Sequence, residues 1–277
     1  RDDGIESSFY APALTSLTQL KASRALDLFL EGVAHFRQFE RINDIPVELR
    51  ARAAIRGVAA VAPTELSVPL LIELLTHTED LMTQESAAAL GRIGDHRAFA
   101  PLIDLLKSGR HPSDAAEAAA ALANLGDPAA VPHLFQMLDA PSYLTPRAVL
   151  RALGQLGDPS IVPQLLPWLE HYHSETAEAA VEALAHIGGE QAMKAIRPYL
   201  RTGDGGQRRL VAEAAQRWAD QPSVPILAER LQTELQWEAR QAAVEALKQL
   251  DPNHPALSHD AANDPIPAVR EVTRAST

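Results

Sequence analysis

The sequence predicts an all-α fold, a right-handed superhelix of about six to seven stacked two-helix repeats. Three observations predict this fold. The chain of 277 residues has an internal period of 31 to 32 residues, its apolar residues recur at helical spacing, and its apolar content is mostly Ala and Leu with only 5% aromatic residues. Small, unbranched side chains of this kind suit closely packed helices better than sheets.

The period is visible in a column of apolar residues near the end of each Ala-rich segment. Its members are Leu90, Leu122, Leu153, Leu184, Ala215 and Leu247. A second column, typical of helix ends, lies four residues further on and consists of Gly94, Gly126, Gly157, Gly188, Ala219 and Asp251. Six segments in one register indicate a tandem array rather than a single globular core.

Each repeat carries the local signals of two helices. Residues 148–156 have apolar side chains at helical spacing, and Gly157 supplies the left-handed conformation that ends a helix. Asp158 is then the expected N-cap of a second helix, and Pro159 its first residue, where a missing N–H costs nothing. One such helix pair buries too little surface to offset its loss of backbone entropy, so each repeat must stack on its neighbours.

Several single residues in the helices also lead to expectations. Pro167 and Pro198 occupy one column inside consecutive second helices, and each should kink its helix because proline removes a backbone donor. Trp218 stands in a column that is otherwise aliphatic, which predicts a core position. Trp237 begins its helix and is expected to be partly exposed.

The segment Ala152–Pro163, "ALGQLGDPSIVP", carries the most complete copy of the repeat motif. This motif resembles the HEAT-repeat family, and more closely its short-repeat branch known from phycobilin lyases. The resemblance extends from about Ala51 to Asp264. It implies a HEAT-type solenoid whose Ala-rich helices line a concave face. It is specific for the fold and not for a function, because one fold serves many functions.

The two ends differ from the array, which we expect to span residues 47–264. Residues 1–46 lack the repeat and predict an N-terminal helical cap. Residues 265–277 predict the start of a further repeat or a C-terminal cap. The first residue is Arg1, which suggests a processed or truncated N-terminus, and a cytoplasmic location is expected. No apolar run approaches the roughly 18–20 residues that would span a bilayer.

Composition narrows the classes of function. Lys and Arg total 25 against 36 Asp and Glu, a formal net charge of −11, which disfavours nucleic acid and anionic membranes as partners. Cysteine is absent, which excludes disulfides and thiolate catalysis. The sequence therefore predicts a non-catalytic scaffold or adaptor with no cofactor, which binds a helix or an extended segment of a protein partner.

The predicted partner-binding residues follow from the register of the Ala-rich helices. Positions six before, two before and two after each reference residue form one exposed stripe. Gln84, Ala88 and Arg92 occupy it in the first repeat of the register. The predicted binding residues are Arg147, Arg151, Gln155, Glu178, Glu182, His186, Arg209, Glu213 and Arg217. These side chains either form a solvated row, in part paired with one another, or dock a partner.

The sequence predicts no catalytic or metal site. His171 and His173 lie in a turn, with Glu175 and His186 as conceivable neighbours, but a zinc site needs three or four converging ligands. The sequence has no His-Glu dipeptide, whereas deoxyhypusine hydroxylase, an enzyme with similar helical repeats, ligates iron with such pairs. The alternative function is implied by the resemblance alone: a phycobilin lyase or isomerase subunit that handles a linear tetrapyrrole on a phycobiliprotein.

Overall fold

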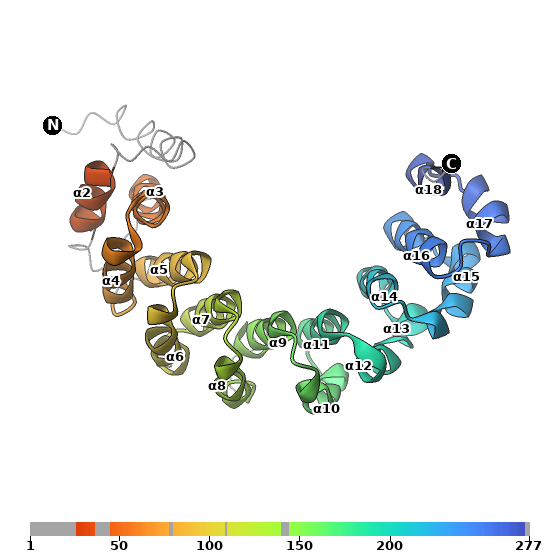
Figure 1. Ribbon diagram of the computed structural model, residues 1–277, viewed down its shortest axis with the longest axis horizontal. Coiled ribbons are helices and arrows are strands. Elements are labelled where there is room, and N and C mark those ends of the chain that lie inside the picture. The colour runs from red at the N-terminus through yellow and green to blue at the C-terminus, as the bar shows by residue number, and fades with distance from the viewer. Residues whose placement is uncertain (1–25, 37–44, 78–79, 109, 140–143, 275–277) are drawn as a thin grey trace. The chain divides into compact units, whose positions relative to one another are not determined.

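The computed structural model describes residues 26–36, 45–77, 80–108, 110–139 and 144–274 (Figure 1). Within these ranges the chain consists of helices and turns, and no strand occurs. Contacts divide the chain into two compact units, Arg1–Ala152 and Leu153–Thr277. The predicted all-α fold of stacked helical repeats is confirmed within each unit.

Unit 1 contains two rows of helices (Figure 1). One row holds the Ala-rich helices α3 (Ile45–Val61), α5 (Asp80–Ile93), α7 (Pro112–Leu125) and most of α9 (Leu144–Leu156). The other holds α4 (Thr64–Leu74), α6 (Phe99–Lys107) and α8 (Val131–Gln136). Helix α5 packs against α3 on one side and α7 on the other, while α4 and α6 pack against α5 and α7. The apolar core therefore lies between the two rows.

Unit 2 repeats this arrangement. Its Ala-rich row contains α11 (Ser174–Ile187), α14 (Gly205–Arg217), α16 (Trp237–Leu250) and α18 (Pro267–Arg274), each in contact with the next. The other row contains α10 (Val162–Leu165), α12 (Gly189–Ile196), α13 (Tyr199–Thr202), α15 (Val224–Thr233) and α17 (Pro255–His259). All six residues of the predicted reference column are fully buried across the two units.

Glycines bring neighbouring Ala-rich helices close together. A Cβ added to Gly91 on α5 would lie 2.7 Å from the Cα of Ala121 on α7. In unit 2, a Cβ on Gly154 would lie 2.5 Å from the Cα of Ala183 on α11. Both glycines directly follow a reference residue, and both alanines directly precede the next one. The repeat therefore encodes a backbone-to-backbone contact that a larger side chain would obstruct.

The predicted helix ends are largely confirmed. Gly94, Gly126, Gly157 and Gly188 have φ between 68° and 73°, and Ala219 adopts a φ of 53° in the same column. The last member differs, because Asp251 has a φ of −143°. The carboxylates of Asp95, Asp127 and Asp158 each accept a backbone N–H two residues further on. A short 3-10 turn, such as Pro159–Ile161, then precedes the α-helix, which therefore begins later than predicted.

Pro167 and Pro198 interrupt their helices as predicted. Helix α10 ends at Leu165, and a 3-10 segment, Leu166–Glu170, contains Pro167. Helix α12 ends at Ile196, and α13 resumes at Tyr199, directly after Pro198. The missing N–H of each proline accounts for the break, because it removes one helical hydrogen bond and its ring crowds the preceding turn.

The prediction that Trp218 lies in the core is wrong. Its side chain is 41% exposed, its Nε1 donates to the carbonyl oxygen of Ala185 at 3.0 Å, and its ring covers Gly188. Helix α14 ends at Arg217, so Trp218 follows the last helical residue and lies over the preceding repeat's helix end instead of beneath it. Trp237 is also 41% exposed, as expected.

At the N-terminal end, α2 (Leu26–Phe36) packs against α3, and the buried ring of Phe29 lies against Gly57. Most of the predicted cap, residues 1–46, lies outside the described residues. At the other end, α18 continues the Ala-rich row beyond α16. The boundaries of cap, array and C-terminal segment stay predictions.

Candidate functional site

The predicted stripe residues of unit 2 lie on α9, α11 and α14. Gln155, Glu178, His186, Arg209 and Arg217 are exposed, and Glu182 and Glu213 are partly exposed. On α14, Arg209 Nη1 lies 2.6 Å from Glu213 Oε1. On α11, His186 Nδ1 lies 2.8 Å from the Glu182 carbonyl oxygen. Because α11 packs against α14, the two helices present these polar groups side by side.

The remaining predicted residues, Arg147 and Arg151, belong to unit 1. Arg147 is half-buried on α9, and Arg151 is exposed one turn further on. The predicted set therefore divides at Ala152. Unit 1 carries the same stripe on α5 through Gln84, Ala88 and Arg92, and it is there that a pocket lies.

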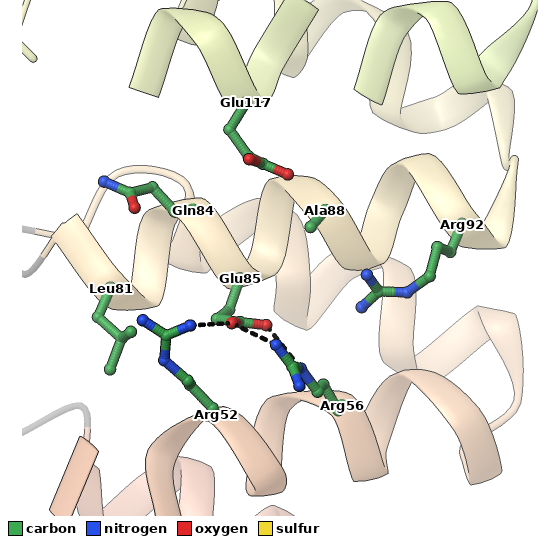
Figure 2. Close-up of a pocket in the computed structure, with 8 residues that line it drawn as sticks. All are labelled: Arg52, Arg56, Leu81, Gln84, Glu85, Ala88, Arg92 and Glu117. Carbon is green, nitrogen blue, oxygen red and sulfur yellow. Dashed lines mark hydrogen bonds and ion pairs between the residues drawn. The ribbon is translucent and has the colours of Figure 1, made fainter. Parts of the chain in front are cut away.

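The pocket in unit 1 has a volume of about 290 Å³ and opens over α5, with contributions from α3 and α7 (Figure 2). Its lining residues are Arg52, Arg56, Leu81, Gln84, Glu85, Ala88, Arg92 and Glu117. Three of them are the stripe residues of α5. The site therefore lies on the predicted face, in a repeat outside the predicted residue set.

Glu85 is the fixed centre of this pocket, because its side chain is only 7% exposed and is held by two arginines from α3. Arg56 donates through Nε to Glu85 Oε2 at 2.9 Å and through Nη2 to Oε1 at 2.8 Å. Arg52 donates through Nη1 to Oε1 at 3.1 Å and also contacts Glu48. The hydrogen bond to Glu85 raises the pKa of Arg56 above its ordinary value, so its charge is permanent.

Arg92 and Glu117 are the less constrained charges of the pocket. Arg92 is exposed and makes no hydrogen bond or ion pair within the described part of the chain. Figure 2 shows its side chain extending from α5 toward the side of α3, where Arg56 lies. Glu117 reaches down from α7. Burial raises the pKa of Glu117, the Glu85 carboxylate raises it further, and Arg92 partly opposes both effects.

A second pocket, of about 490 Å³, adjoins the first and shares Arg56 and Arg92 with it. Its other lining residues are Ala59, Ala60, Ala89 and Ile93. Small apolar side chains form its walls, and two guanidinium groups lie at the junction with the polar pocket. Together the two pockets place an apolar surface beside one of mixed charge, with three arginines and two glutamates.

The sequence contained a signal for Arg52 and Arg56. Val58 precedes Leu90 by 32 residues and is fully buried, so it belongs to the reference column. Arg52 and Arg56 lie six and two residues before it, which are stripe positions. The burial of Glu85 had no such signal, because a glutamate on a helix is normally solvated.

Unit 2 contains a different acid–arginine cluster between α14, α15 and α16. Glu234 accepts hydrogen bonds from Arg208 and, at 3.0 Å, from Arg230 Nη2. Burial alone would raise the pKa of Glu234, but these hydrogen bonds and one from the Gln236 backbone lower it to about 2. Nearby, Arg240 is buried and donates to Asp264 at 2.7 Å.

No group of three or more histidines, cysteines or acidic residues among the described residues is placed to hold a metal ion. The rings of His171, Tyr172 and His173 instead lie against one another, with Tyr172 largely exposed. In the same part of the chain, no helix has the length and apolar character needed to cross a membrane.

Stacked helical hairpins define the class as an α-helical repeat protein. The model of a family described as HEAT repeats matches residues 39–123, 99–169, 131–217 and 162–248. These matches cover most of the chain, which therefore belongs to the HEAT-repeat family. No curated protein matches the sequence.

Among similar solved structures, the first two described below have the same fold. The YibA protein of Escherichia coli has a TM-score of 0.60 at 14% identity, with 91% of this chain and 96% of that chain covered. The complex of CpcE and CpcF of phycocyanin lyase from Nostoc has a TM-score of 0.53 at 21% identity, covering 88% and 91%. Human deoxyhypusine hydroxylase with glycerol has a TM-score of 0.40 at 23% identity, covering 94% and 97%.

Proposed function

We propose that this chain is a non-catalytic scaffold or adaptor that binds a helix or an extended segment of a protein partner. The binding surface is the stripe face, defined as the face of the Ala-rich helices that carries the stripe residues in each unit. The observation that carries the proposal is the repetition of exposed polar and charged side chains at fixed register, from Arg52 and Arg56 on α3 to Arg209, Glu213 and Arg217 on α14.

The charges on this face favour a protein partner. Acidic Glu178 and Glu182 on α11 lie beside the mixed charges of α14, and the whole chain carries a formal charge of −11. A nucleic acid would require a concentrated basic surface. Mixed charges instead give register and specificity to a protein interface, where complementary potentials align two surfaces.

The alternative is a phycobilin lyase subunit. Its support is the similarity in fold to the complex of CpcE and CpcF. A tetrapyrrole site would need aromatic and charged groups around a large cleft. Neither pocket of unit 1 has an aromatic side chain in its lining, which favours the scaffold. Mixing the protein with phycocyanobilin at tens of micromolar should leave the absorbance spectrum of the pigment unchanged, and a clear shift would support the lyase.

The scaffold proposal is tested by reversing charge on the stripe face. The double variant Arg147→Glu and Arg151→Glu should keep the helical circular-dichroism spectrum and weaken capture of the native partner. The matched control is Lys107→Glu with Lys194→Glu, two exposed lysines on α6 and α12 in the other row, and it should capture normally. Unchanged capture by the stripe variant, or an equal loss in the control, would contradict the proposal.

A further inference from the structure

The two adjoining pockets of unit 1 specify the chemistry of a partner segment. We infer that α3 and α5 dock a short protein segment in which an Asp or Glu is next to a bulky apolar residue. The carboxylate lies between Arg56 and Arg92, and the apolar side chain lies over Ala59, Ala60 and Ala89. This inference rests on the proposed function, because it names the partner chemistry for one part of the stripe face.

Arg56 is prepared to bind a carboxylate. Glu85 fixes its guanidinium through Nε and Nη2, so the side chain is held in one orientation. Its Nη1 makes no hydrogen bond to any described residue, and two N–H groups are therefore available to a ligand. A donor that is already oriented loses little entropy on binding.

Arg92 supplies the second donor and the charge. Glu48 and Glu85 together balance Arg52 and Arg56, to which they are hydrogen-bonded. Arg92 is exposed and is hydrogen-bonded to no described residue, and its charge is offset only by the electrostatic interaction with Glu117. It also lines both pockets, as Arg56 does, so one acceptor group at their junction can meet both guanidinium groups.

The glutamates of the pocket favour a ligand group with a single negative charge. Glu85 is buried below the junction and Glu117 lines the same pocket from α7. The three arginines and two glutamates of the lining carry a formal charge of +1 (3 − 2), which one carboxylate balances, whereas a phosphate group carries nearly two negative charges and exceeds it. The site is therefore suited to Asp or Glu rather than to a phosphorylated residue or a nucleic acid backbone.

The apolar pocket completes the recognition. Its walls are mostly alanine methyl groups together with Ile93, and its volume of about 490 Å³ leaves space for a large side chain. A Leu, Ile or Phe that enters this pocket would be removed from water, which favours binding. Because the pockets share Arg56 and Arg92, neighbouring residues of one segment can occupy both.

The test selects peptides from a random display library against the full chain and titrates the best one by fluorescence anisotropy. Selected peptides should share an acidic residue next to a bulky apolar one. Arg92→Glu should lower the affinity for the peptide about tenfold, because one charged hydrogen-bonding partner is lost. A tenfold loss corresponds to about 1.4 kcal/mol. A peptide with Lys in place of its acidic residue should regain affinity for Arg92→Glu, which a merely misfolded variant could not show.

Two further variants sharpen the titration. Ala60→Trp places a ring at an exposed edge of the apolar pocket, and it should remove the preference for a bulky apolar residue. Lys194→Glu, which reverses an exposed charge on α12 in the other row of helices, is the control and should bind the peptide normally. Equal affinity for wild type and Arg92→Glu, or displacement of the peptide by millimolar inorganic phosphate, would overturn the inference.

The inference and the proposed function fail separately. If Arg147→Glu with Arg151→Glu loses the native partner and Arg92→Glu keeps it, the scaffold stands and this docking site does not. If neither variant loses the partner, both proposals fail. If the chain self-associates in sedimentation experiments and Arg92→Glu makes it monomeric, the occupant is a second copy of the chain, and the inference as stated is wrong.

Discussion

Two carboxylates in different units, Glu85 and Glu234, have partners of the same kind but lie in different surroundings. Each is almost fully buried and each is held by two arginines. Around Glu85 the arginine side chains are 38% and 53% exposed and line a pocket. Around Glu234 they are only 17% and 20% exposed. The enclosed cluster stabilises the fold, whereas the arginines of the open one also line a pocket.

The difference follows from where each cluster lies in the repeat. Arg52 and Arg56 occupy stripe positions on α3, so they reach solvent beyond the helix row. Arg208 precedes a stripe position by one residue, and Glu234 lies in the turn before α16. The ion pair of Arg208 with Glu234 connects successive repeats, because the two residues are 26 positions apart in the sequence. One residue of helical register therefore separates an enclosed arginine from one at a stripe position.

The largest effect is expected for Glu234→Gln. The change leaves two enclosed guanidinium groups without their carboxylate and should destabilise unit 2 by about 3 kcal/mol. Glu85→Gln should cost only about 1 kcal/mol, because water can solvate Arg52 and Arg56 once they are released. Hydrogen exchange measures both losses, in α14 and α16 for Glu234→Gln and in α3 and α5 for Glu85→Gln. Equal losses would refute the distinction between the clusters.

The next effect concerns the packing that both units share. Gly154→Ala and Gly91→Ala each place a methyl group against a neighbouring backbone, at 2.5 Å and 2.7 Å. Each should lower the free energy of unfolding, measured by urea titration, by about 1–3 kcal/mol. Gly206→Ala is the control, since its added Cβ would lie 3.4 Å from Asp204 Oδ1, and it should be neutral or stabilising. A harmless Gly154→Ala would mean that the helices do not approach so closely.

The smallest effect is a difference in pH dependence between the units. The lowered pKa of Glu234, about 2, gives stability that is present above its ordinary pKa of 4.5 and lost as pH falls toward 2. The pKa of Glu117 is raised, so its contribution is full below pH 4.5 and is lost as pH rises through the raised value. The contributions of the two carboxylates to stability therefore change with pH in opposite directions.

Glu117→Gln removes the charge that burial disfavours. Its free energy of unfolding should exceed that of the wild type by about 0.5 kcal/mol at pH 7 and match it near pH 4. In contrast, Glu234→Gln should lose the most stability near pH 7 and approach the wild type at low pH. Urea titrations at several pH values measure both trends, and the same sign for both variants would contradict the assignment of the pKa shifts.

The sequence predicted the features that depend on a few consecutive residues. Gly157, Asp158 and Pro167 act through their own backbone conformations or through hydrogen bonds a few residues away. The family resemblance added the stacking of hairpins, which the structure and the family match confirm. The position of Trp218 was not predictable from its column, because it depends on where α14 ends.

The candidate site was only partly predictable. The register already marked Gln84, Ala88 and Arg92 as exposed, and extending it to Val58 would have marked Arg52 and Arg56. The burial of Glu85 depends on a contact with Arg52, which lies 33 residues away in the sequence. This contact requires the packing of α3 on α5. A pocket arises from such contacts between repeats and has no signature within one repeat.

The central claim is that partners bind the Ala-rich helices and not the other row. The most direct measurement is hydrogen exchange by mass spectrometry on the full chain with and without its captured native partner. We predict added protection in α3 and α5, and in α11 and α14 where the partner extends into unit 2, with none in α4, α6, α12 or α15. Protection that falls mainly on the second group of helices would contradict the account.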